Sequence, residues 1–314
     1  EEAAREAYYQ LQYTLPRENG YFLYDPDDPT TLKAEQSYYG YLAAQARTET
    51  GQKQLQVAAD RVVADVHKKY FAVLEARQAL ESALAGAAGA EAAAQAARAR
   101  YQAGMISQLE LDQAEQDRMD AEKNAADAKA ALEQAYRSLN DLLGLPSTAR
   151  PVLTEEVVFS PVEPIDNLAA YARSVLAQDP VLWQLQRGVD LEKTLSGQPG
   201  TDEERAALKI EQASLDRDRY RRQMEQAIPE IYEGILQMER QCKTLEQALA
   251  TARESLRVAE LSYQVGLATQ ADVLAARAGV ARAEEALLRL AVQHRLAKLR
   301  LAKPWLDAAG SAGA

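Results

Sequence analysis

Residues 101–108 read Tyr-Gln-Ala-Gly-Met-Ile-Ser-Gln, and residues 263–270 read Tyr-Gln-Val-Gly-Leu-Ala-Thr-Gln. Both stretches share the pattern Tyr-Gln-x-Gly, and they lie 162 residues apart. In each, the glycine suits the left-handed position that ends a helix. The hydroxyl residue three positions later starts a capping box, S-x-x-E in the first stretch and T-x-x-D in the second. Each stretch therefore predicts a tight turn between two helices.

Long segments with few helix breakers precede both turns. No proline lies between residues 32 and 101, and Pro229 is the only one between residues 202 and 263. Helices of this length would extend on the order of 100 Å. The second segment places apolar residues at a 4-3 spacing, which indicates a left-handed coiled-coil seam. Its members are Met224, Ile228, Ile231, Ile235, Met238, Cys242, Leu245, Leu249, Ala252, Leu256, Ala259 and Tyr263.

The same shift of 162 residues places a second seam on the first segment, from Val62 to Tyr101, with only Lys69 out of pattern. The returning segment 270–301 carries two apolar stripes, one through Val273 and Leu290 and one through Ala278 and Val292. Two stripes require contacts on two sides. The sequence therefore predicts an all-α fold, an elongated antiparallel coiled-coil bundle of two repeated long helical hairpins.

Prolines and glycines mark the breaks between the helical segments. Residues 14–31 are expected to form a loop, and the connector 147–164 to include a short strand at 152–159. A break at 197–200 is followed by a capping box from Thr201 to Glu204 that restarts a helix. This divides the chain into a first hairpin repeat, the extended connector, a second repeat and a flexible tail, at residues 1–146, 147–164, 165–303 and 304–314.

Composition excludes several classes of function. The net charge is −11, which argues against a nucleic-acid binder because such proteins are basic. The single cysteine and two histidines give no disulfide framework, zinc pattern or catalytic arrangement, so we expect no enzyme, cofactor or metal. Cys242 and His294 fall on apolar stripes and are expected to be packed. No apolar run approaches the roughly 18–20 residues of a membrane-spanning helix.

The doubled turn, its long flanking helices and the closing Leu139-Asn-Asp-Leu-Leu-Gly-Leu-Pro146 resemble the TolC-like outer-membrane efflux proteins. The resemblance covers about residues 50–303. It implies a TolC-like α-barrel protomer, in a homotrimer that forms a tunnel and meets a membrane-fusion adaptor. The turns would be the adaptor-docking tips, and two acidic residues would lie at a tunnel constriction. The docking residues are Ala103, Gly104, Met105, Ser107, Val265, Gly266, Leu267 and Thr269, and those at the constriction are Glu110 and Asp272.

The sequence departs from the family between the short and long helix of each repeat, where members carry a two-strand membrane hairpin. Residues 196–201 are too few for one, and prolines interrupt 14–31, so we expect a protomer without transmembrane β-strands. Eight of the fifteen tyrosines lie in the first 41 residues. They predict either an aromatic plug that closes the bundle or an end that contacts a membrane surface, cell wall or partner through Tyr21, Phe22 and Tyr24.

Two functions remain open from the sequence. The first is a TolC-like envelope protein without a membrane barrel, docked to an adaptor of an efflux or export system. The second is a non-transporting extracytoplasmic coiled-coil scaffold. In both cases we expect an extracytoplasmic location, periplasmic or cell-surface, with any signal or anchor absent from this chain.

Overall fold

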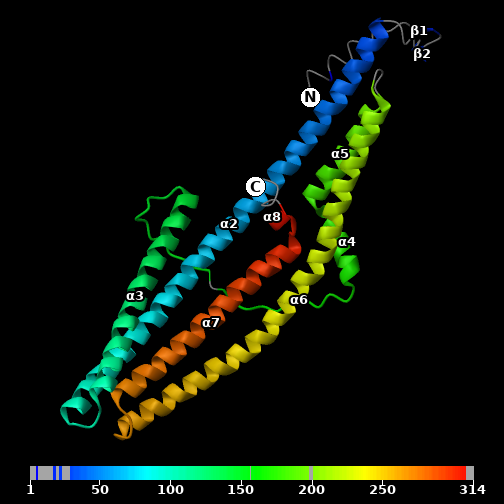
Figure 1. The fold of residues 1–314 in the computed structure, drawn as a ribbon. Helices are drawn as coiled ribbons and strands as arrows, with labels where there is room; N and C mark the ends of the chain where they lie inside the picture. Colours follow the sequence, from blue (N-terminus) through cyan, green and yellow to red (C-terminus); the bar gives the residue numbers. More distant parts are fainter. Residues whose placement is uncertain are drawn as a thin grey trace. The chain divides into compact units, whose positions relative to one another are not determined.

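The computed structural model describes residues 5, 17–18, 21–22, 29–155, 157–197 and 201–308. Two long helices, α2 (Pro29–Gln102) and α6 (Glu203–Gln264), each lead through a tight turn into a returning helix, α3 (Gln108–Leu143) and α7 (Gln270–Ala302), as Figure 1 shows. The shorter helices are α4 (Leu168–Gln178), α5 (Pro180–Leu195) and α8 (Trp305–Ala308). The prediction of an all-α fold with two repeated helical hairpins is confirmed.

The helix ends differ from prediction at two places. The expected loop at 14–31 contains a two-residue antiparallel pair, β1 (Arg17–Glu18) with β2 (Tyr21–Phe22), and α2 already begins at Pro29. Proline fits the first helical position, where its missing N–H leaves no bond unmade. Helix α6 is capped by Asp202, whose carboxylate accepts from the Arg205 N–H at 3.1 Å, and not by Thr201.

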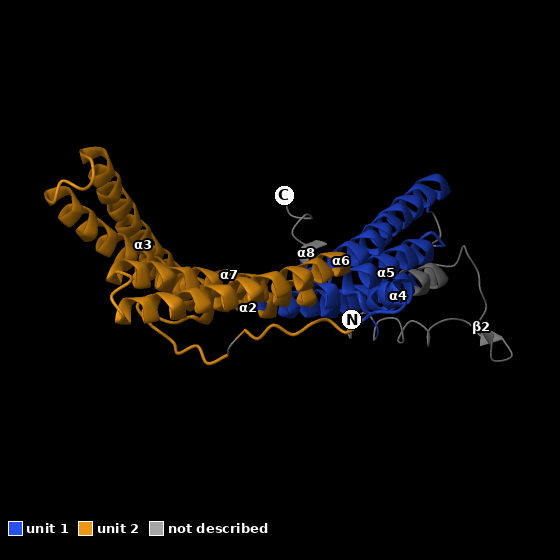
Figure 2. Ribbon diagram, turned by 90° about the horizontal axis from the view of Figure 1, so that it is seen from below, with its two compact units in different colours: residues 1–62, 164–231, 300–314 blue, residues 63–163, 232–299 orange. Residues whose placement is uncertain are grey.

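The chain separates into two compact units that cut across the sequence repeats (Figure 2). Unit 1 comprises residues 1–62, 164–231 and 300–314, and unit 2 comprises residues 63–163 and 232–299. Each unit therefore takes helix segments from both repeats. The division by repeats at residues 146, 164 and 303 remains a prediction about the sequence.

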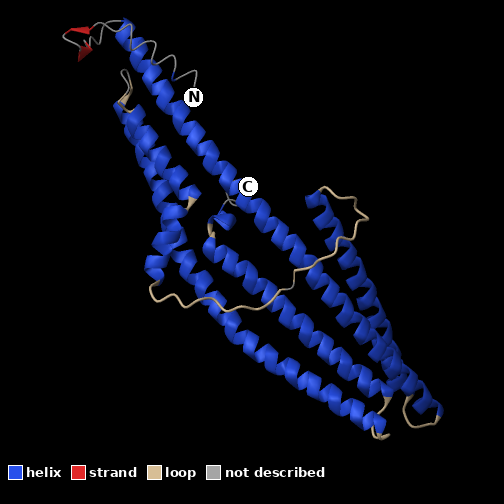
Figure 3. Ribbon diagram, turned by 180° about the vertical axis from the view of Figure 1, so that it is seen from behind, coloured by secondary structure: helices blue, strands red, loops and turns tan. Residues whose placement is uncertain are grey.

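In unit 2 the helices follow the order α3, α2, α7, α6, which Figures 1 and 3 show from opposite sides. Helix α7 is thus covered on two sides, and every residue of its two predicted stripes is buried or half-buried. Phe71 and Leu74 of α2 pack against Val292 of α7. At Gly89 the two helices approach so closely that a Cβ would lie 3.5 Å from the backbone of Ala275. The prediction of two-sided packing is confirmed.

The predicted seam of α6 is buried or half-buried from Met224 to Ala259, and Cys242 is 2% exposed. Tyr263, the last predicted member, is 50% exposed. On α2, Val62 and Tyr101 are also exposed, so the ends of the first predicted seam are wrong. The 4-3 pattern thus predicts burial correctly through most of each seam but extends too far at the ends of the seams.

The connector after α3 is an extended segment that crosses α2, α7 and α6 (the tan trace in Figure 3). It is not a strand, in the parts of 147–164 that the structure describes. The Tyr70 hydroxyl bonds both backbone groups of Glu155, accepting from the N–H at 2.8 Å and donating to the carbonyl at 3.2 Å. A side chain on α2 therefore occupies the place that a neighbouring strand would take.

The far end of the connector is fixed by His294, which is 2% exposed. Its ring lies 4.3 Å from the Phe159 ring, and its Nε2 is 3.2 Å from Glu239 Oε1. The same carboxylate oxygen accepts from the Val162 N–H at 2.6 Å, and Lys298 donates to the Ser160 carbonyl at 3.0 Å. The prediction of a packed histidine is confirmed.

In unit 1 a buried and a half-buried acidic side chain join separate elements. Asp179, 1% exposed, accepts from the N–H groups of Val181 and Leu182 at the start of α5 and from the Tyr220 hydroxyl of α6 at 2.8 Å. Burial raises the pKa of Asp179, although these hydrogen bonds act in the opposite direction. Asp60 of α2 accepts from the Trp305 indole at 3.0 Å, which attaches the C-terminal helix.

Candidate functional site: the two hairpin turns

The two turns between long and returning helices have the same backbone geometry. Gly104 and Gly266 have φ of 72° and 77°, in the left-handed region that glycine tolerates. Each glycine N–H bonds the carbonyl three residues back, and the next N–H bonds the carbonyl five residues back, at 2.8–3.0 Å. This is the Schellman arrangement, which satisfies the last carbonyls of a helix. The predicted helix stops are confirmed.

The predicted capping boxes are both present and nearly identical. The backbone N–H and hydroxyl of Ser107 donate to Glu110 at 2.7 and 2.8 Å, and those of Thr269 donate to Asp272 at the same two distances. Hydrogen bonds from the backbone N–H and then the hydroxyl lower the pKa of each carboxyl. The proposed constriction residues Glu110 and Asp272 are thus exposed, ionised helix caps in this chain.

Large apolar side chains project from these rigid turns. Met105 is 73% exposed, Val265 69% and Leu267 83%, and all eight proposed docking residues are exposed. Leu109, 77% exposed in the first turn of α3, was not among them. Its place two residues after the cap Ser107, in the first turn of α3, is the signal that could have identified it. The two turns lie at the same end of unit 2 in Figures 1 and 2.

Each hairpin is closed by an ion pair at the same level, with its charges inverted between the repeats. In the first hairpin Arg98 of α2 pairs with Glu115 of α3, and Arg98 Nη2 lies 2.9 Å from Glu115 Oε2. In the second hairpin the equivalent positions are Glu260 of α6 and Arg277 of α7, 3.0 Å apart. The hydrogen bond from Arg98 lowers the pKa of Glu115 to about 2.

A second pair of positions also differs in charge between the repeats, but without inversion. Arg253 of α6 pairs with Glu284 of α7 at 2.9 Å. The equivalent residues in the first repeat are two glutamates, Glu91 and Glu122, and Arg118 contacts both of them. In the first hairpin the cation is therefore Arg118 of α3 and not a residue at the position of Arg253. Both hairpins have ion pairs between their two helices at these two places along the helices.

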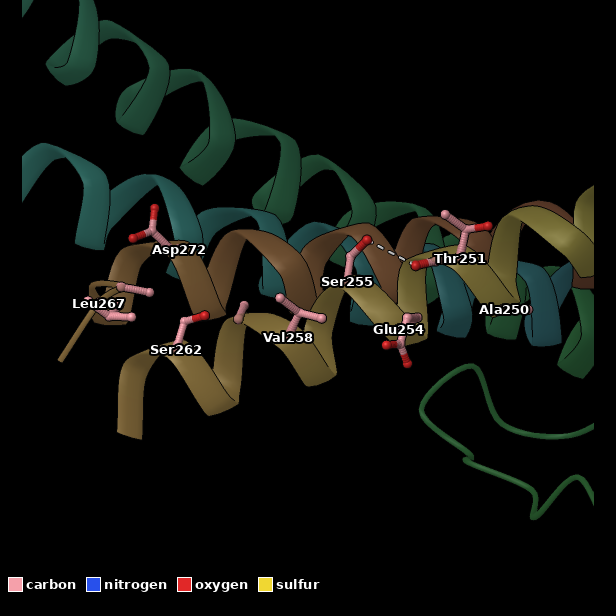
Figure 4. Close-up of a pocket in the computed structure, with 10 residues that line it drawn as sticks. Ala250, Thr251, Glu254, Ser255, Val258, Ser262, Leu267 and Asp272 are labelled. Atoms are coloured by element: carbon pink, nitrogen blue, oxygen red, sulfur yellow. Dashed lines mark hydrogen bonds between the residues drawn. The ribbon is translucent and has the colours of Figure 1, made fainter. Parts of the chain in front are cut away.

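A groove of about 670 Å³ runs beside the second turn (Figure 4). Its floor is a face of α6 with small and hydroxyl side chains, and Leu267 and Asp272 lie at its turn end. The Ser255 hydroxyl donates to the Thr251 carbonyl at 3.0 Å, so the hydroxyls bond their own helix. This arrangement offers a surface for packing and contains no nucleophile–base pair.

Tyr21 and Phe22 form strand β2, while Tyr24 lies outside the described residues. Within the described ranges, no group of three or more His, Cys, Asp or Glu side chains could hold a metal ion. Among the helices that the structure describes, none has the length and apolar character required to cross a membrane.

The fold, with its doubled and capped turns, is the helical fold of TolC-like protomers. The structure resembles the Campylobacter jejuni CmeC outer membrane channel, with a TM-score of 0.59 and 12% identity over 96% of this chain and 81% of that one. It also resembles a membrane protein from Pseudomonas aeruginosa (TM-score 0.56, 15% identity, 96% and 87%) and VceC, an outer membrane protein of Vibrio cholerae (0.50, 14%, 97% and 90%).

Residues 35–145 match the family described as outer membrane efflux protein. No curated protein matches the chain. The resemblance indicated by the doubled turn is thereby confirmed. The chain has the TolC-like fold, and its first repeat carries the sequence pattern of the outer membrane efflux proteins.

Proposed function

We propose that the chain is a cell-envelope protein that docks a membrane-fusion adaptor through its two hairpin turns, as part of an efflux or export system. The observation that carries this proposal is the exposure of Met105, Val265 and Leu267 on two equivalent turns at one end of unit 2. The matched family of outer membrane efflux proteins supports transport over enzymatic chemistry.

The turns suit docking because their apolar side chains are held by rigid backbone. A Schellman motif on one side and a capping box on the other fix each turn before a partner arrives. Little conformational entropy is then lost on binding, so exposed apolar anchors contribute more of their burial to affinity. Large apolar side chains that a folded protein leaves exposed together commonly mark an interaction site.

Replacement of the anchors tests the docking. We expect the double substitution Met105→Ser and Leu267→Ser to weaken binding of the full chain to the membrane-fusion adaptor of the same cell by at least about tenfold in titration calorimetry. The matched control is Leu208→Ser, since Leu208 is 59% exposed on α6 in unit 1. Equal affinity of the turn variant and the control would refute the assignment of the turns.

The transport role also requires assembly. Under the proposal three copies form a tunnel wall, and Glu110 and Asp272 lie near its narrow end. Light scattering should then give three times the 34.5-kDa mass of the chain. A strict monomer that binds no adaptor would favour the extracytoplasmic scaffold, in which the hairpins serve only as an interaction surface. An end contact through Tyr21, Phe22 and Tyr24 remains part of the proposal.

A further inference from the structure

A groove of about 520 Å³ lies in unit 1 between α2 and α5, whereas the hairpin turns belong to unit 2. The two helices are antiparallel here. Lys53 of α2 lies over the Trp183 ring of α5, and Glu49 pairs with Arg187, so the residue number on α2 falls as that on α5 rises. The groove therefore follows the seam between these two helices, which supply all of its lining residues.

Part of the lining is apolar and leaves open space. Ala46 on α2 is 3% exposed. The lining on α5 includes half-buried aliphatic side chains, which are Val181, Leu185 and Leu191. At Gly188, between the last two, a Cβ would meet no atom within 4 Å. Small residues on both helices therefore leave room in which an apolar group can pack against aliphatic side chains.

The charged part of the lining is cationic, in a chain whose net charge is −11. Two arginines line the groove, Arg47 of α2 and Arg187 of α5, and none of the described lining residues is a carboxylate. Arg187 pairs with Glu49, whereas Arg47 forms no ion pair within the described part of the chain. Two arginines and one glutamate leave a single positive charge at the groove, which matches one monoanionic group.

Arg187 retains hydrogen-bonding capacity that its ion pair does not use. Its Nε lies 2.9 Å from Glu49 Oε2, but the oxygen is not in line with the N–H, and this buried Nε has no hydrogen-bond acceptor among the described residues. Such a buried donor normally has a partner. A guanidinium has five N–H donors, whose planar arrangement matches the two oxygens of a carboxylate. Thr50, Gln54 and Gln184 add a hydroxyl and two amides to the lining.

We propose that this groove binds a small amphiphile that has one carboxylate and a short aliphatic tail. The carboxylate binds Arg47 and Arg187, and the tail packs at Gly188 against the aliphatic side chains of α5. The volume lies in the range of about 300–1,000 Å³ that is typical of small-molecule sites. The single net positive charge favours a carboxylate over a phosphate, which carries about two negative charges at neutral pH. The site is a different surface from the hairpin turns and does not depend on the docking proposed above.

Four ligands test this proposal, with decanoate as the principal probe. Decanol keeps the tail without the charge, acetate keeps the charge without the tail, and decyl phosphate represents the headgroup of a phospholipid. Titration calorimetry with the full chain is carried out at neutral pH, below the concentration at which decanoate forms micelles. Decanoate should bind at least about tenfold more tightly than decanol or acetate, because each of these lacks one half of the interaction. It should also bind more tightly than decyl phosphate.

Two matched pairs of variants separate the charge from the space. Arg47→Gln should weaken decanoate by at least about tenfold and leave decanol unchanged. Its control is Arg222→Gln, since Arg222 on α6 is also exposed and without an ion pair among the described residues. Gly188→Leu fills the groove and should weaken both ligands, whereas Gly234→Leu, on α6 and also with open space at its Cβ, should weaken neither. Circular dichroism verifies the folding of each variant.

Three results would overturn the proposal. Equal affinity of the Gly188 and Gly234 variants for decanoate would show that the ligand binds elsewhere. Equal affinity of the Arg47 and Arg222 variants would remove the role of Arg47. Tighter binding of decyl phosphate than of decanoate would assign the groove to a phosphate headgroup. The turn variant Met105→Ser with Leu267→Ser should bind decanoate like the native chain, so failure of the docking function and failure of this site are distinguishable.

Discussion

Single residues at the helix ends control where each hairpin reverses. Gly104, Gly144 and Gly266 have positive φ, and each ends a helix. For a residue with a Cβ this conformation costs about 1–2 kcal/mol. The turn geometry therefore depends on glycine at these positions, and glycines inside the helices have no such role.

The first prediction separates these two kinds of glycine. Gly266→Ala should destabilise the protein by about 1 kcal/mol, because alanine must adopt φ near the observed 77°. Gly234→Ala, inside α6, should instead stabilise by about 0.5–1 kcal/mol because it raises helix propensity. The urea midpoints of both variants measure the difference. Shifts in the same direction would contradict the assignment of strain to residue 266.

His294 makes stability depend on pH. Burial lowers its pKa below the usual 6.5, although Glu239 acts in the opposite direction. Below pH 6.5 the unfolded chain binds a proton that the folded protein binds only at lower pH. Its contribution to stability is therefore complete above about pH 7.5 and falls as the pH drops through 6.5 toward the folded pKa.

The variant His294→Gln lacks this titration and provides the comparison. We expect the free energy of unfolding of the native chain to decrease more between pH 7.5 and 5.5 than that of the variant. Urea titrations at several pH values measure both slopes. Parallel slopes would show that His294 does not couple folding to protonation.

At the residue scale, the sequence predicts the caps of both turns because glycine and Ser/Thr-x-x-Glu/Asp act locally. The contacts of other residues are not predicted from the sequence, because they depend on distant parts of the chain. Tyr70 and Glu155 meet across 85 residues, and no local pattern links them. Asp202 displaced Thr201 as a cap because both can accept the same kind of hydrogen bond, and only the backbone path decides between them.

Whole helices are joined in pairs by ion pairs that the two repeats make in opposite senses. Arg98 with Glu115 and Glu260 with Arg277 occupy equivalent levels of their hairpins. The positions are side by side in each antiparallel pair, so either orientation of charge fits. Each hairpin therefore has an ion pair at the same distance from its turn, although the cation and the anion exchange helices between the two repeats.

This equivalence predicts the outcome of exchanging charges. Arg98→Glu alone should lower the thermal midpoint, because it places two carboxylates together. The double variant Arg98→Glu with Glu115→Arg places the charges of the second hairpin at this level. It should recover part of the loss, because it restores the pair between the helices but removes the contact of Glu115 with Arg118. The recovery should shrink at high salt, since these side chains are exposed. A double variant that is less stable than the single one would contradict the equivalence.

At the element scale, periodicity predicts what touches a helix but not what covers a loop. The two stripes of α7 predict its two neighbours because burial must follow the 3.6-residue period. The alternation in residues 152–159 is equally real, since Leu153 and Val157 face the core and Val152 and Val158 are exposed. Alternation alone cannot supply a strand partner, and here Tyr70 and Lys298 side chains bond the backbone instead.

For the molecule as a whole, the sequence conceals the boundaries of the two units. The seam of α6 continues from Met224 to Ala259 across the boundary between residues 231 and 232. A continuous heptad pattern reports local packing only, so no composition change marks that boundary. The net charge, by contrast, is a property of the entire chain and is read directly from the sequence.

The net charge of −11 predicts how assembly responds to salt. Three like-charged copies repel each other, and at 0.15 M ionic strength the screening length is only about 8 Å. The fraction of the proposed trimer in light scattering should therefore increase between roughly 0.02 and 0.3 M sodium chloride. Dissociation over that range would indicate that attractive ion pairs between copies dominate assembly.

The inverted ion pairs also affect which helices pair during the folding of a chain that contains two similar hairpins. Helix α2 packs against α7 as well as α3 in the folded protein, with Gly89 next to Ala275, so a wrong α2–α7 pair would differ from the native contact in its register. In the hairpin register that wrong pair would place Arg98 against Arg277, and the remaining helices would place Glu260 against Glu115. Both wrong pairings bring like charges together, and both correct pairings bring opposite charges together. The charges therefore favour the pairing of each long helix with the returning helix of its own repeat.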